Sequence, residues 1–330
     1  MGFCRGRCLL MTALVVVLGS PLWVYAIKEA FYGLVTDAIF EHCHGAATAS
    51  FDPNTTLPWA QEFRAGWRDI RDELHAYERQ AGYIPPLTDI EPTQVNQAPH
   101  KQWKSLWLQL YGRKSKISAH FPKTMAMLEK TTVVTAMFSI LEPGRGLELH
   151  RGDFKGLWRY HVALEHPPPS AGETEASEPL FLAVATKPRY GSERPVFRKY
   201  FWAEGEHLLF DDTFWHKVEN RRAKSGRKVV LFMDVPRRDC PAWLGSVLWY
   251  STRYVIQRIP RIGRLISLAD DAAERGEVAL KGRGDTGSIN KVTGVLHGIP
   301  LDLAEGEAER WPAASQGGVV AGEARGEDEL

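Results

Sequence analysis

Two histidines stand where short apolar runs end, and their side chains could bind a metal ion. His150 closes the run that begins at Leu147, and His216 directly follows Phe214 and Trp215. A neutral imidazole is a good ligand for a borderline divalent metal, and two imidazoles on neighbouring strands leave several coordination positions open. Oxygen activation requires such an open ion. The pattern therefore predicts a metal site at His150 and His216.

Three further residues could bind an acid near that metal. Arg159 and His161 are two apart, so on a β-strand their side chains would share one face. Arg227 follows His216 by eleven residues, at the head of an apolar run that ends near Pro236. A guanidinium can hold a carboxylate through two parallel hydrogen bonds.

The segments around these residues are those of an antiparallel β domain. From Thr131 to Pro236, short runs rich in β-branched and aromatic residues alternate with turn signals. Before them, apolar residues from Trp59 to Tyr77 recur at the three- and four-residue spacings of an amphipathic helix. A second short helix is predicted at 122–130, and 101–110 fits either a helix or a strand. The fold class is thus mainly β with flanking α-helices.

The N-terminal region contains a candidate membrane segment. Residues 8–27 carry no charge, and twenty residues are enough to cross a bilayer core of roughly 30 Å as a helix. We expect a single transmembrane anchor at 8–27, between a tail at 1–7 and a linker at 28–58. A cleavable signal peptide is the alternative, because Val24 to Ala26 resembles a cleavage site. The side of the membrane stays open.

The C-terminal region is predicted to change character twice. Residues 239–266 combine aromatic residues with arginines, as in a basic amphipathic helix on a membrane surface; a helix docked on the β domain is the alternative. Residues 267–330 are rich in Gly, Ala and Glu, and we expect most of them to be disordered.

Composition excludes some partners. Lys and Arg number 41 against 40 for Asp and Glu, so the chain lacks the overall basic field of a nucleic-acid-binding protein. The four cysteines, at positions 4, 8, 43 and 240, do not predict a disulfide framework.

The residues from about Trp59 to Pro236 resemble the aspartyl/asparaginyl β-hydroxylases, which include protein-modifying enzymes and bacterial lipid A acyl-chain hydroxylases. The similarity is most specific over Ser139–His161 and Phe210–Asp234. It implies that residues 59–238 form a double-stranded β-helix (jelly-roll, cupin-like) barrel. The upstream segments and the N-terminal apolar run are closer in appearance to the lipid A branch.

The resemblance also implies a set of roles. His150 and His216 would bind Fe(II), and 2-oxoglutarate and O2 would be consumed. Arg159 and His161 would contact the 1-carboxylate end of 2-oxoglutarate. Ser139 and Arg227 would hold its distal carboxylate.

One position departs from the pattern of most non-haem iron oxygenases. They carry a carboxylate two residues after the first histidine, and here that position is Gly152. The protein-modifying branch resembles this chain in having glycine there. Asp153 is an alternative ligand, if a turn redirects it toward the metal.

These observations favour a dioxygenase that hydroxylates an unactivated C–H bond, on a lipid A-like acyl chain, in a protein held by one membrane span. Hydroxylation of aspartyl or asparaginyl residues in a protein is the first alternative. A non-catalytic barrel that has lost its metal is the second, motivated by Gly152. A cupin-like metal isomerase, which would not need Arg227, is the third.

Overall fold

The computed structural model describes the chain at residues 40 and 43 and over the ranges 48–80, 83–91, 103–152, 154–167, 180–186, 196–201, 203–220 and 226–282. The predicted anchor at 8–27, the tail at 1–7 and Asp153 lie outside these residues. No helix in the described part is both long enough and apolar enough to cross a membrane.

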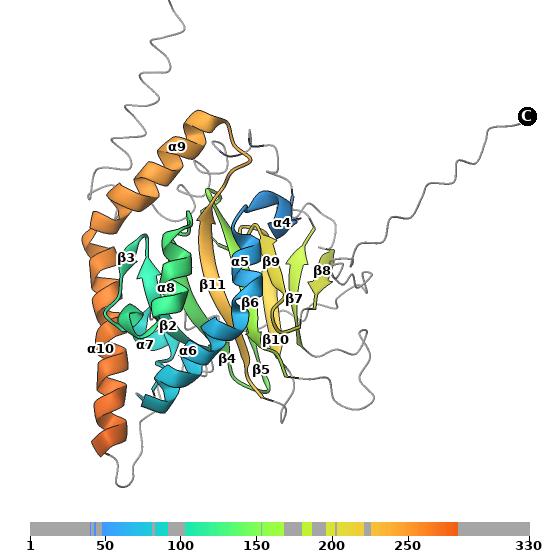
Figure 1. Ribbon diagram of the computed structural model, residues 1–330. Coiled ribbons are helices and arrows are strands. Elements are labelled where there is room, and N and C mark those ends of the chain that lie inside the picture. Colours follow the sequence, from blue (N-terminus) through green and yellow to red (C-terminus); the bar gives the residue numbers. More distant parts are fainter. Residues whose placement is uncertain are drawn as a thin grey trace, which may run out of the picture.

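The described strands form two antiparallel sheets (Figure 1). The larger sheet has seven strands, in the spatial order β1 (Ser50–Phe51), β9 (His207–Phe210), β6 (Leu157–Glu165), β11 (Lys228–Pro236), β4 (Thr135–Leu141), β2 (Trp103–Leu110) and β3 (Arg113–Lys114). The smaller sheet has four, in the order β5 (Arg145–His150), β10 (His216–Asn220), β7 (Leu180–Ala185) and β8 (Phe197–Tyr200).

Connectivity between the sheets is that of a double-sheet jelly roll. From β4 to β11 the chain passes repeatedly from one sheet to the other, returning to the larger sheet at β6, β9 and β11. The mainly β fold with flanking helices is therefore confirmed. The predicted jelly-roll barrel is present as two separate sheets, because no strand pairing joins them into a closed barrel in the described residues.

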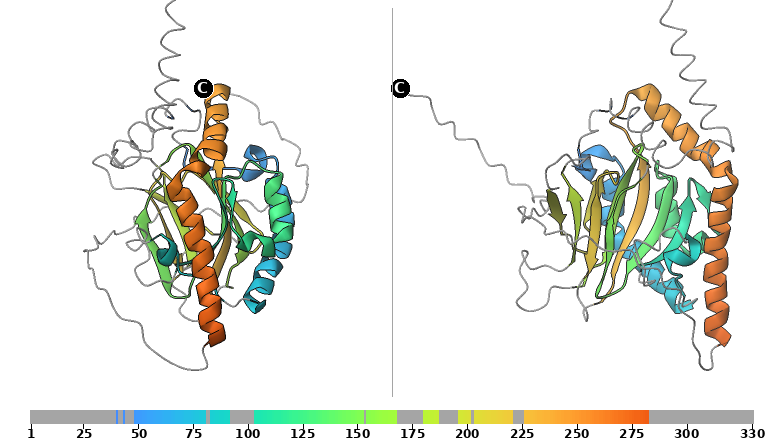
Figure 2. Two further views of the ribbon diagram at one scale, coloured as in Figure 1. Left: turned by 90° about the vertical axis from the view of Figure 1, so that its left-hand side faces the viewer. Right: turned by 180° about the vertical axis from the view of Figure 1, so that it is seen from behind.

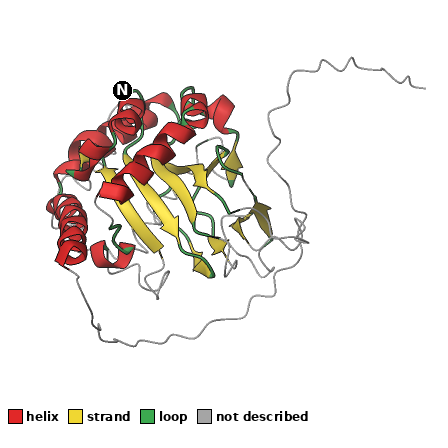
Figure 3. Cartoon of the chain, turned by 60° about the horizontal axis from the view of Figure 1, so that its bottom comes forward, coloured by secondary structure: helices red, strands yellow, loops and turns green. Residues whose placement is uncertain are grey.

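Helices cover the outer face of the larger sheet, as Figures 1 and 3 show. One hydrophobic core lies between this face and helices α5 (Ala60–Ala65), α6 (Trp67–Gln80) and α8 (Pro122–Glu129). A second core lies between the two sheets. Strand β11 contributes to both, since Val229 and Leu231 belong to the first core and Val230 and Phe232 to the second. Alternation along β11 therefore decides which of its residues face the space between the sheets.

The ends of the domain differ from the prediction. Strand β1 pairs with β9, and helix α4 (Pro53–Thr56) follows, so the last part of the predicted linker belongs to the fold. Helix α9 (Ala242–Tyr250) continues through a π-helical turn (Ser251–Val255) and a 3₁₀ turn (Ile256–Arg258) into α10 (Pro260–Gly282).

Helix α10 therefore runs into the region that was predicted to be disordered. It stands along the edge formed by β2 and β3 and contacts α7 (Leu87–Ile90), as Figure 2 shows. Its residues Ile262, Ile266 and Ala269 are buried in the second core. Burial of this apolar stripe, which continues at Ala272, gives the first part of the predicted tail tertiary contacts that its composition does not suggest.

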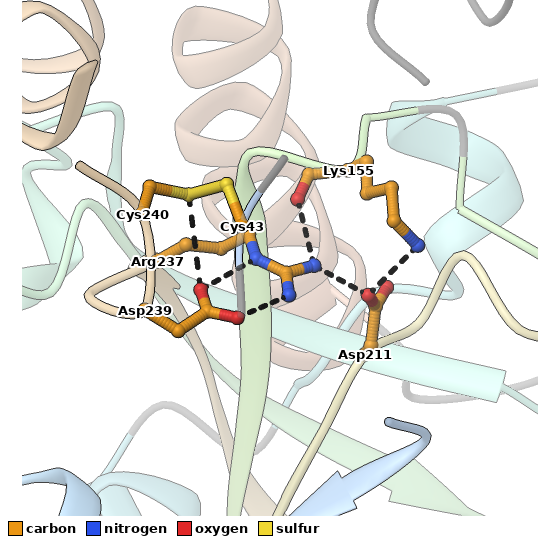
Figure 4. Close-up of a disulfide and its surroundings, with 6 residues drawn as sticks. All are labelled: Cys43, Lys155, Asp211, Arg237, Asp239 and Cys240. Atoms are coloured by element: carbon orange, nitrogen blue, oxygen red, sulfur yellow. Dashed lines mark hydrogen bonds and ion pairs between the residues drawn. A yellow bond between two sulfur atoms is a disulfide. The ribbon is translucent and has the colours of Figure 1, made fainter. Parts of the chain in front are cut away.

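A disulfide between Cys43 and Cys240 joins the middle of the predicted linker to the segment just before α9 (Figure 4). The cysteine positions did not predict a framework of several disulfides. The single disulfide found here joins residues that are 197 positions apart in the sequence. Beside it, the buried Arg237 guanidinium binds both carboxylate oxygens of Asp239, at 2.9 and 2.7 Å, and Asp211 Oδ2 at 2.6 Å. Lys155 Nζ also lies 3.3 Å from Asp211 Oδ2.

We expect the double variant Cys43→Ser/Cys240→Ser to be less stable than the native chain by about 2–5 kcal/mol, because a long closed loop restricts the unfolded chain. Chemical denaturation followed by circular dichroism measures this difference. A reductant should lower the stability of the native chain by a similar amount. The matched control Cys4→Ser/Cys8→Ser should leave it unchanged, and identical midpoints for all variants would contradict the bridge.

Candidate functional site

The two predicted metal histidines lie side by side in the smaller sheet. His150 ends β5 and His216 begins β10, and the antiparallel register pairs them directly. Their ring centroids are 4.2 Å apart. The register shifts between His216 and Val218, which marks a β-bulge of the kind that redirects side chains next to functional sites.

Each ring is oriented by its own backbone. His150 Nδ1 donates to the carbonyl of Glu148 at 2.6 Å, and His216 Nδ1 donates to the carbonyl of Phe214 at 2.9 Å. Both hydrogen bonds place the proton on Nδ1, so each Nε2 presents a lone pair. This is the arrangement by which proteins fix the tautomer of a metal-binding histidine.

Both imidazoles are held in their neutral form. Burial, with a smaller contribution from the nearby Arg159, lowers the pKa of His150 to about 4. Burial also lowers the pKa of His216 well below its usual value, with His150 contributing. Because only the neutral ring binds a metal, the pair is ready to do so at neutral pH.

A cavity between the two sheets contains both histidines. Its walls come from strands of both sheets, and they are mostly apolar with a few polar groups. The lining residues are Trp103, Ser139, Leu141, Leu147, His150, Arg159, His161, Leu182, Phe210, His216, Val218, Lys228, Val230 and Phe232. A small number of polar groups in an apolar pocket is typical of a small-molecule site.

Arg159 and His161 share the cavity face of β6, as their spacing predicts. The His161 ring packs against Phe210 and Phe232, each with a centroid distance of 5.4 Å, and burial lowers its pKa well below the usual value. Arg159 forms ion pairs with Asp212 at 2.9 Å and Asp234 at 3.1 Å. These carboxylates hold the guanidinium in the cavity wall.

Ser139 lies on β4, at another part of the wall. Its hydroxyl oxygen accepts a hydrogen bond from the indole N–H of Trp103 at 2.9 Å. The hydroxyl hydrogen can then be donated to a ligand, since a hydroxyl accepts and donates at once. Ser139 pairs in register with Val230, two residues beyond Lys228 on β11.

The structure corrects the prediction for Arg227, which lies outside the cavity. Its guanidinium binds Glu165 at 2.9 and 2.7 Å and Glu78 Oε2 at 2.9 Å. The next residue, Lys228, lines the cavity instead. Neighbouring residues on a strand point to opposite faces, so an error of one position moved the predicted cation to the wrong side.

Lys228 is a residue that the sequence reasoning missed. It is 5% exposed, and burial lowers the pKa of its ammonium well below the usual value. A buried lysine favours an anionic partner, which restores the stability of its charged form. The sequence offered no clear signal for it, because β11 is buried on both faces and shows no polar alternation.

Asp212 is a second residue that the sequence reasoning missed. A Cβ atom added at Gly152 would lie 2.1 Å from Asp212 Oδ2, so the Asp212 carboxylate fills the space of any side chain at position 152. The Gly152 N–H also donates to the Asp212 carbonyl at 2.7 Å. Asp212 thus brings a negative charge beside the position where most related oxygenases carry their acid.

The donor set fits a divalent metal held by two imidazoles. Among the described residues, no third His, Cys, Asp or Glu joins the two histidines in a cluster whose ligand atoms all lie within 4.8 Å of one another. Asp212 is therefore near the histidines without belonging to such a cluster. Two neutral imidazoles with open positions suit Fe(II) and similar ions.

Comparisons with known proteins identify the family of the chain. The family described as aspartyl/asparaginyl β-hydroxylase matches residues 64–238, more than half of the chain. An ornithine lipid ester-linked acyl 2-hydroxylase of Rhizobium tropici is 32% identical over 181 residues, covering 54% of this chain and 57% of that protein. An aspartyl/asparaginyl β-hydroxylase of Mus musculus is 27% identical over 192 residues, covering 53% of this chain and 22% of that protein.

The match spans less than two thirds of the length of either relative. Among solved structures, a prolyl 4-hydroxylase of Pseudomonas putida is 12% identical, covers 52% of this chain and 88% of that chain, and has a TM-score of 0.33. On the strength of the match over residues 64–238, the chain belongs to the aspartyl/asparaginyl β-hydroxylase family.

Proposed function

We propose that the chain is an Fe(II)- and 2-oxoglutarate-dependent dioxygenase that hydroxylates an unactivated C–H bond of a lipid acyl chain. The observation that carries the proposal is the pair of neutral imidazoles, His150 and His216, in a cavity that also contains hydrogen-bond donors and a buried lysine. His150 and His216 would hold the iron. Bound Fe(II), with 2-oxoglutarate and O2, would supply the oxidising power that no side chain possesses.

The chain's own residues orient the cosubstrate. Lys228 and the Ser139 hydroxyl both donate from the cavity wall, and together they suit the distal carboxylate of 2-oxoglutarate. Arg159 and His161 suit its 1-carboxylate end, in the role that family resemblance implies. Lys228 takes the place that the sequence assigned to Arg227.

Asp212 contributes charge in the same site. Its carboxylate is fixed by Arg159 and fills the space beside Gly152. We infer that it stabilises a cation between the histidines, offsetting the missing acid at position 152. This argues against the alternative in which the barrel has lost its metal.

A lipid acyl chain is favoured as the substrate for two reasons. Apolar side chains form much of the cavity wall, including Leu147, Leu182 and Val218. In addition, one relative is an acyl 2-hydroxylase of a lipid. Hydroxylation of aspartyl or asparaginyl residues remains the second candidate, because the other relative carries that name.

We also propose that residues 8–27 form a single membrane anchor. The uncharged run is long enough to span a bilayer. The Cys43–Cys240 bridge fits a domain on the oxidising side of that membrane, since disulfides persist mainly in such compartments.

The metal assignment predicts the loss of a spectroscopic signal. Anaerobic addition of Fe(II) and 2-oxoglutarate to the native chain should give a weak visible charge-transfer band. His150→Ala and His216→Ala should each lower metal affinity by more than about 100-fold, because even residues that only support a ligand cost 10–100-fold. The exposed His120→Ala is the matched control. No band from the folded native chain would support the metal-free alternative.

The cosubstrate assignment separates Lys228 from its neighbour Arg227. Lys228→Met should raise the KM for 2-oxoglutarate by about 10–100-fold, the cost of losing a charge-assisted hydrogen bond. Arg227→Met should instead lower thermal stability, because it leaves Glu78 and Glu165 without their shared cation, and should leave this KM nearly unchanged. Succinate release and thermal unfolding measure the two effects. The opposite pattern would restore Arg227 as the cosubstrate ligand.

The pH dependence of cosubstrate binding follows from burial of Lys228. Burial lowers the pKa of the ammonium in the free protein, and a bound carboxylate raises this pKa again. At a pH between these two pKa values, binding of 2-oxoglutarate therefore takes up a proton. The KM for 2-oxoglutarate should therefore rise as the pH rises through this window. Lys228→Arg should flatten the profile, because a guanidinium stays charged. A steep profile in this variant would assign the titration to another group.

Product analysis decides between the two substrate classes. The full chain, supplied with Fe(II), 2-oxoglutarate and air, should add one oxygen atom to an acyl chain of ornithine lipid or lipid A, detected by mass spectrometry. His216→Ala should give no product. If peptides containing Asp or Asn gain oxygen while both lipids remain unmodified, the lipid assignment is wrong and the protein-modifying alternative holds.

A further inference from the structure

Exposed aromatic side chains are concentrated on helix α9 and the π-helical turn that follows it. Of the five large hydrophobic residues that are exposed in the described part of the chain, four belong to this stretch: Trp243 (54% exposed), Trp249 (37%), Tyr250 (59%) and Tyr254 (37%). Folding leaves such residues in water only at a cost, so a cluster of them on one helix indicates an interaction surface.

The helix separates a buried face from this aromatic face. Leu244 and Leu248 pack inward. On the outer side, the Tyr254 ring lies 5.5 Å from that of Trp249 and 5.1 Å from that of Tyr250. The π-helical turn at 251–255 brings Tyr254 next to Trp249, five residues earlier, so the rings of Trp249, Tyr250 and Tyr254 lie side by side. Trp and Tyr, apolar bodies with polar tips, are the residues preferred where a membrane meets water.

The charge of this region complements an anionic lipid surface. Residues 240–269 contain four arginines and no Lys, Asp or Glu, although the whole chain has a net charge of only +1. Arg258, Arg261 and Arg264 are exposed. A positive region beside exposed aromatic rings binds anionic headgroups through its charges and acyl chains through its rings.

The connection to the rest of the chain favours a bilayer over a second protein. The Cys43–Cys240 bridge and the cluster of Phe40, Leu244 and Leu248 fix the chain near residue 43 to α9. The uncharged run at 8–27 ends sixteen residues before Cys43. Sixteen residues extend over at most about 55 Å, so a bilayer that contains this run lies within reach of α9.

We propose that the α9 surface, formed by the four aromatic residues together with Arg258, Arg261 and Arg264, docks the domain on an anionic bilayer. The inference goes beyond the proposed function, because docking requires neither iron nor a lipid substrate. It also orients the site. Phe154, in the loop after His150, packs edge-to-face on Phe40 at 5.8 Å, and it packs against the cluster that contains Leu244 and Leu248 of α9, so the loop after His150 lies beside this helix.

Quenching of tryptophan fluorescence by brominated lipids tests the docking. The full chain is reconstituted into phosphatidylcholine vesicles with and without phosphatidylglycerol. Part of the quenching should disappear in Trp243→Phe/Trp249→Phe, and that part measures the contact of α9 with acyl chains. It should be larger in vesicles that contain phosphatidylglycerol, because that lipid is anionic. Equal quenching of the native chain and this variant overturns the proposal.

The charge contribution is tested with Arg258→Gln/Arg264→Gln. Each arginine near an anionic surface contributes about fivefold, so the docking equilibrium should fall about 30-fold and the α9 quenching should be lost. The matched control Lys123→Gln/Lys130→Gln removes one exposed charge from α8 and one from the residue that caps its C-terminus, and should dock normally. Equal loss in both pairs would mean that net charge, not the α9 surface, controls binding.

A second copy of the chain is the competing occupant. If Trp243→Phe/Trp249→Phe leaves quenching unchanged while Tyr250→Ser/Tyr254→Ser converts a dimer into a monomer, the surface is a subunit interface and the bilayer proposal fails. Succinate release is measured separately. A chain that docks but makes no succinate refutes the proposed function alone, and an active chain that does not dock refutes the docking alone.

Discussion

The antiparallel register between β5 and β10 is the constraint on which the site depends. It places His150 opposite His216, and a slip of one residue would move one imidazole to the other face of the smaller sheet. Strand β7 pairs with the other edge of β10, with Val184 opposite His216, so β10 is held on both sides. The bulge beside His216 then adjusts the direction of the pair without changing the strands that carry it. His150 and His216, which are far apart in the sequence, meet because the hydrogen bonds of the sheet fix their relative position.

Buried charges hold the loops that follow these strands. Asp211 Oδ1 accepts from the backbone N–H of Thr213 at 3.0 Å and from its hydroxyl at 2.6 Å, which shapes the turn leading to His216. Asp211 Oδ2 binds Arg237, and Arg237 in turn binds Asp239 next to the disulfide (Figure 4). Replacing such pairs by apolar side chains often costs little, so their value lies less in stability than in selecting one geometry. Here the selected geometry connects the metal end of the cavity to the bridge that fixes α9.

The sequence predicted the parts of the site whose placement depends on a local pattern, namely the residue type or the alternation of side chains along a strand. His150, His216 and the shared face of Arg159 and His161 follow from residue type and strand alternation. Lys228 was missed because every neighbour in β11 is buried, so polarity could not reveal which residues face the cavity. Asp212 was missed because its proximity to Gly152 is created by the pairing of distant segments. The same reason explains the Cys43–Cys240 bridge, since spacing alone says nothing about two residues brought together by the fold.

Arg227 directly precedes the cavity-lining residue Lys228 in the sequence, but its own side chain binds carboxylates outside the cavity. Its guanidinium is surrounded by Glu78 from α6 and Glu165 from β6, and Glu165 also lies 2.8 Å from His75 Nε2. These contacts fasten α6 to the outer face of the larger sheet, at the end of β11 where Lys228 enters the cavity. Arg227 and Lys228 therefore have different roles. Arg227 is neutralised by carboxylates and fixes a helix, whereas Lys228 is buried in the cavity wall, where an anionic ligand would favour its charged form. The fold thus assigns the Arg227 guanidinium to a structural role and places the Lys228 ammonium in the cavity wall.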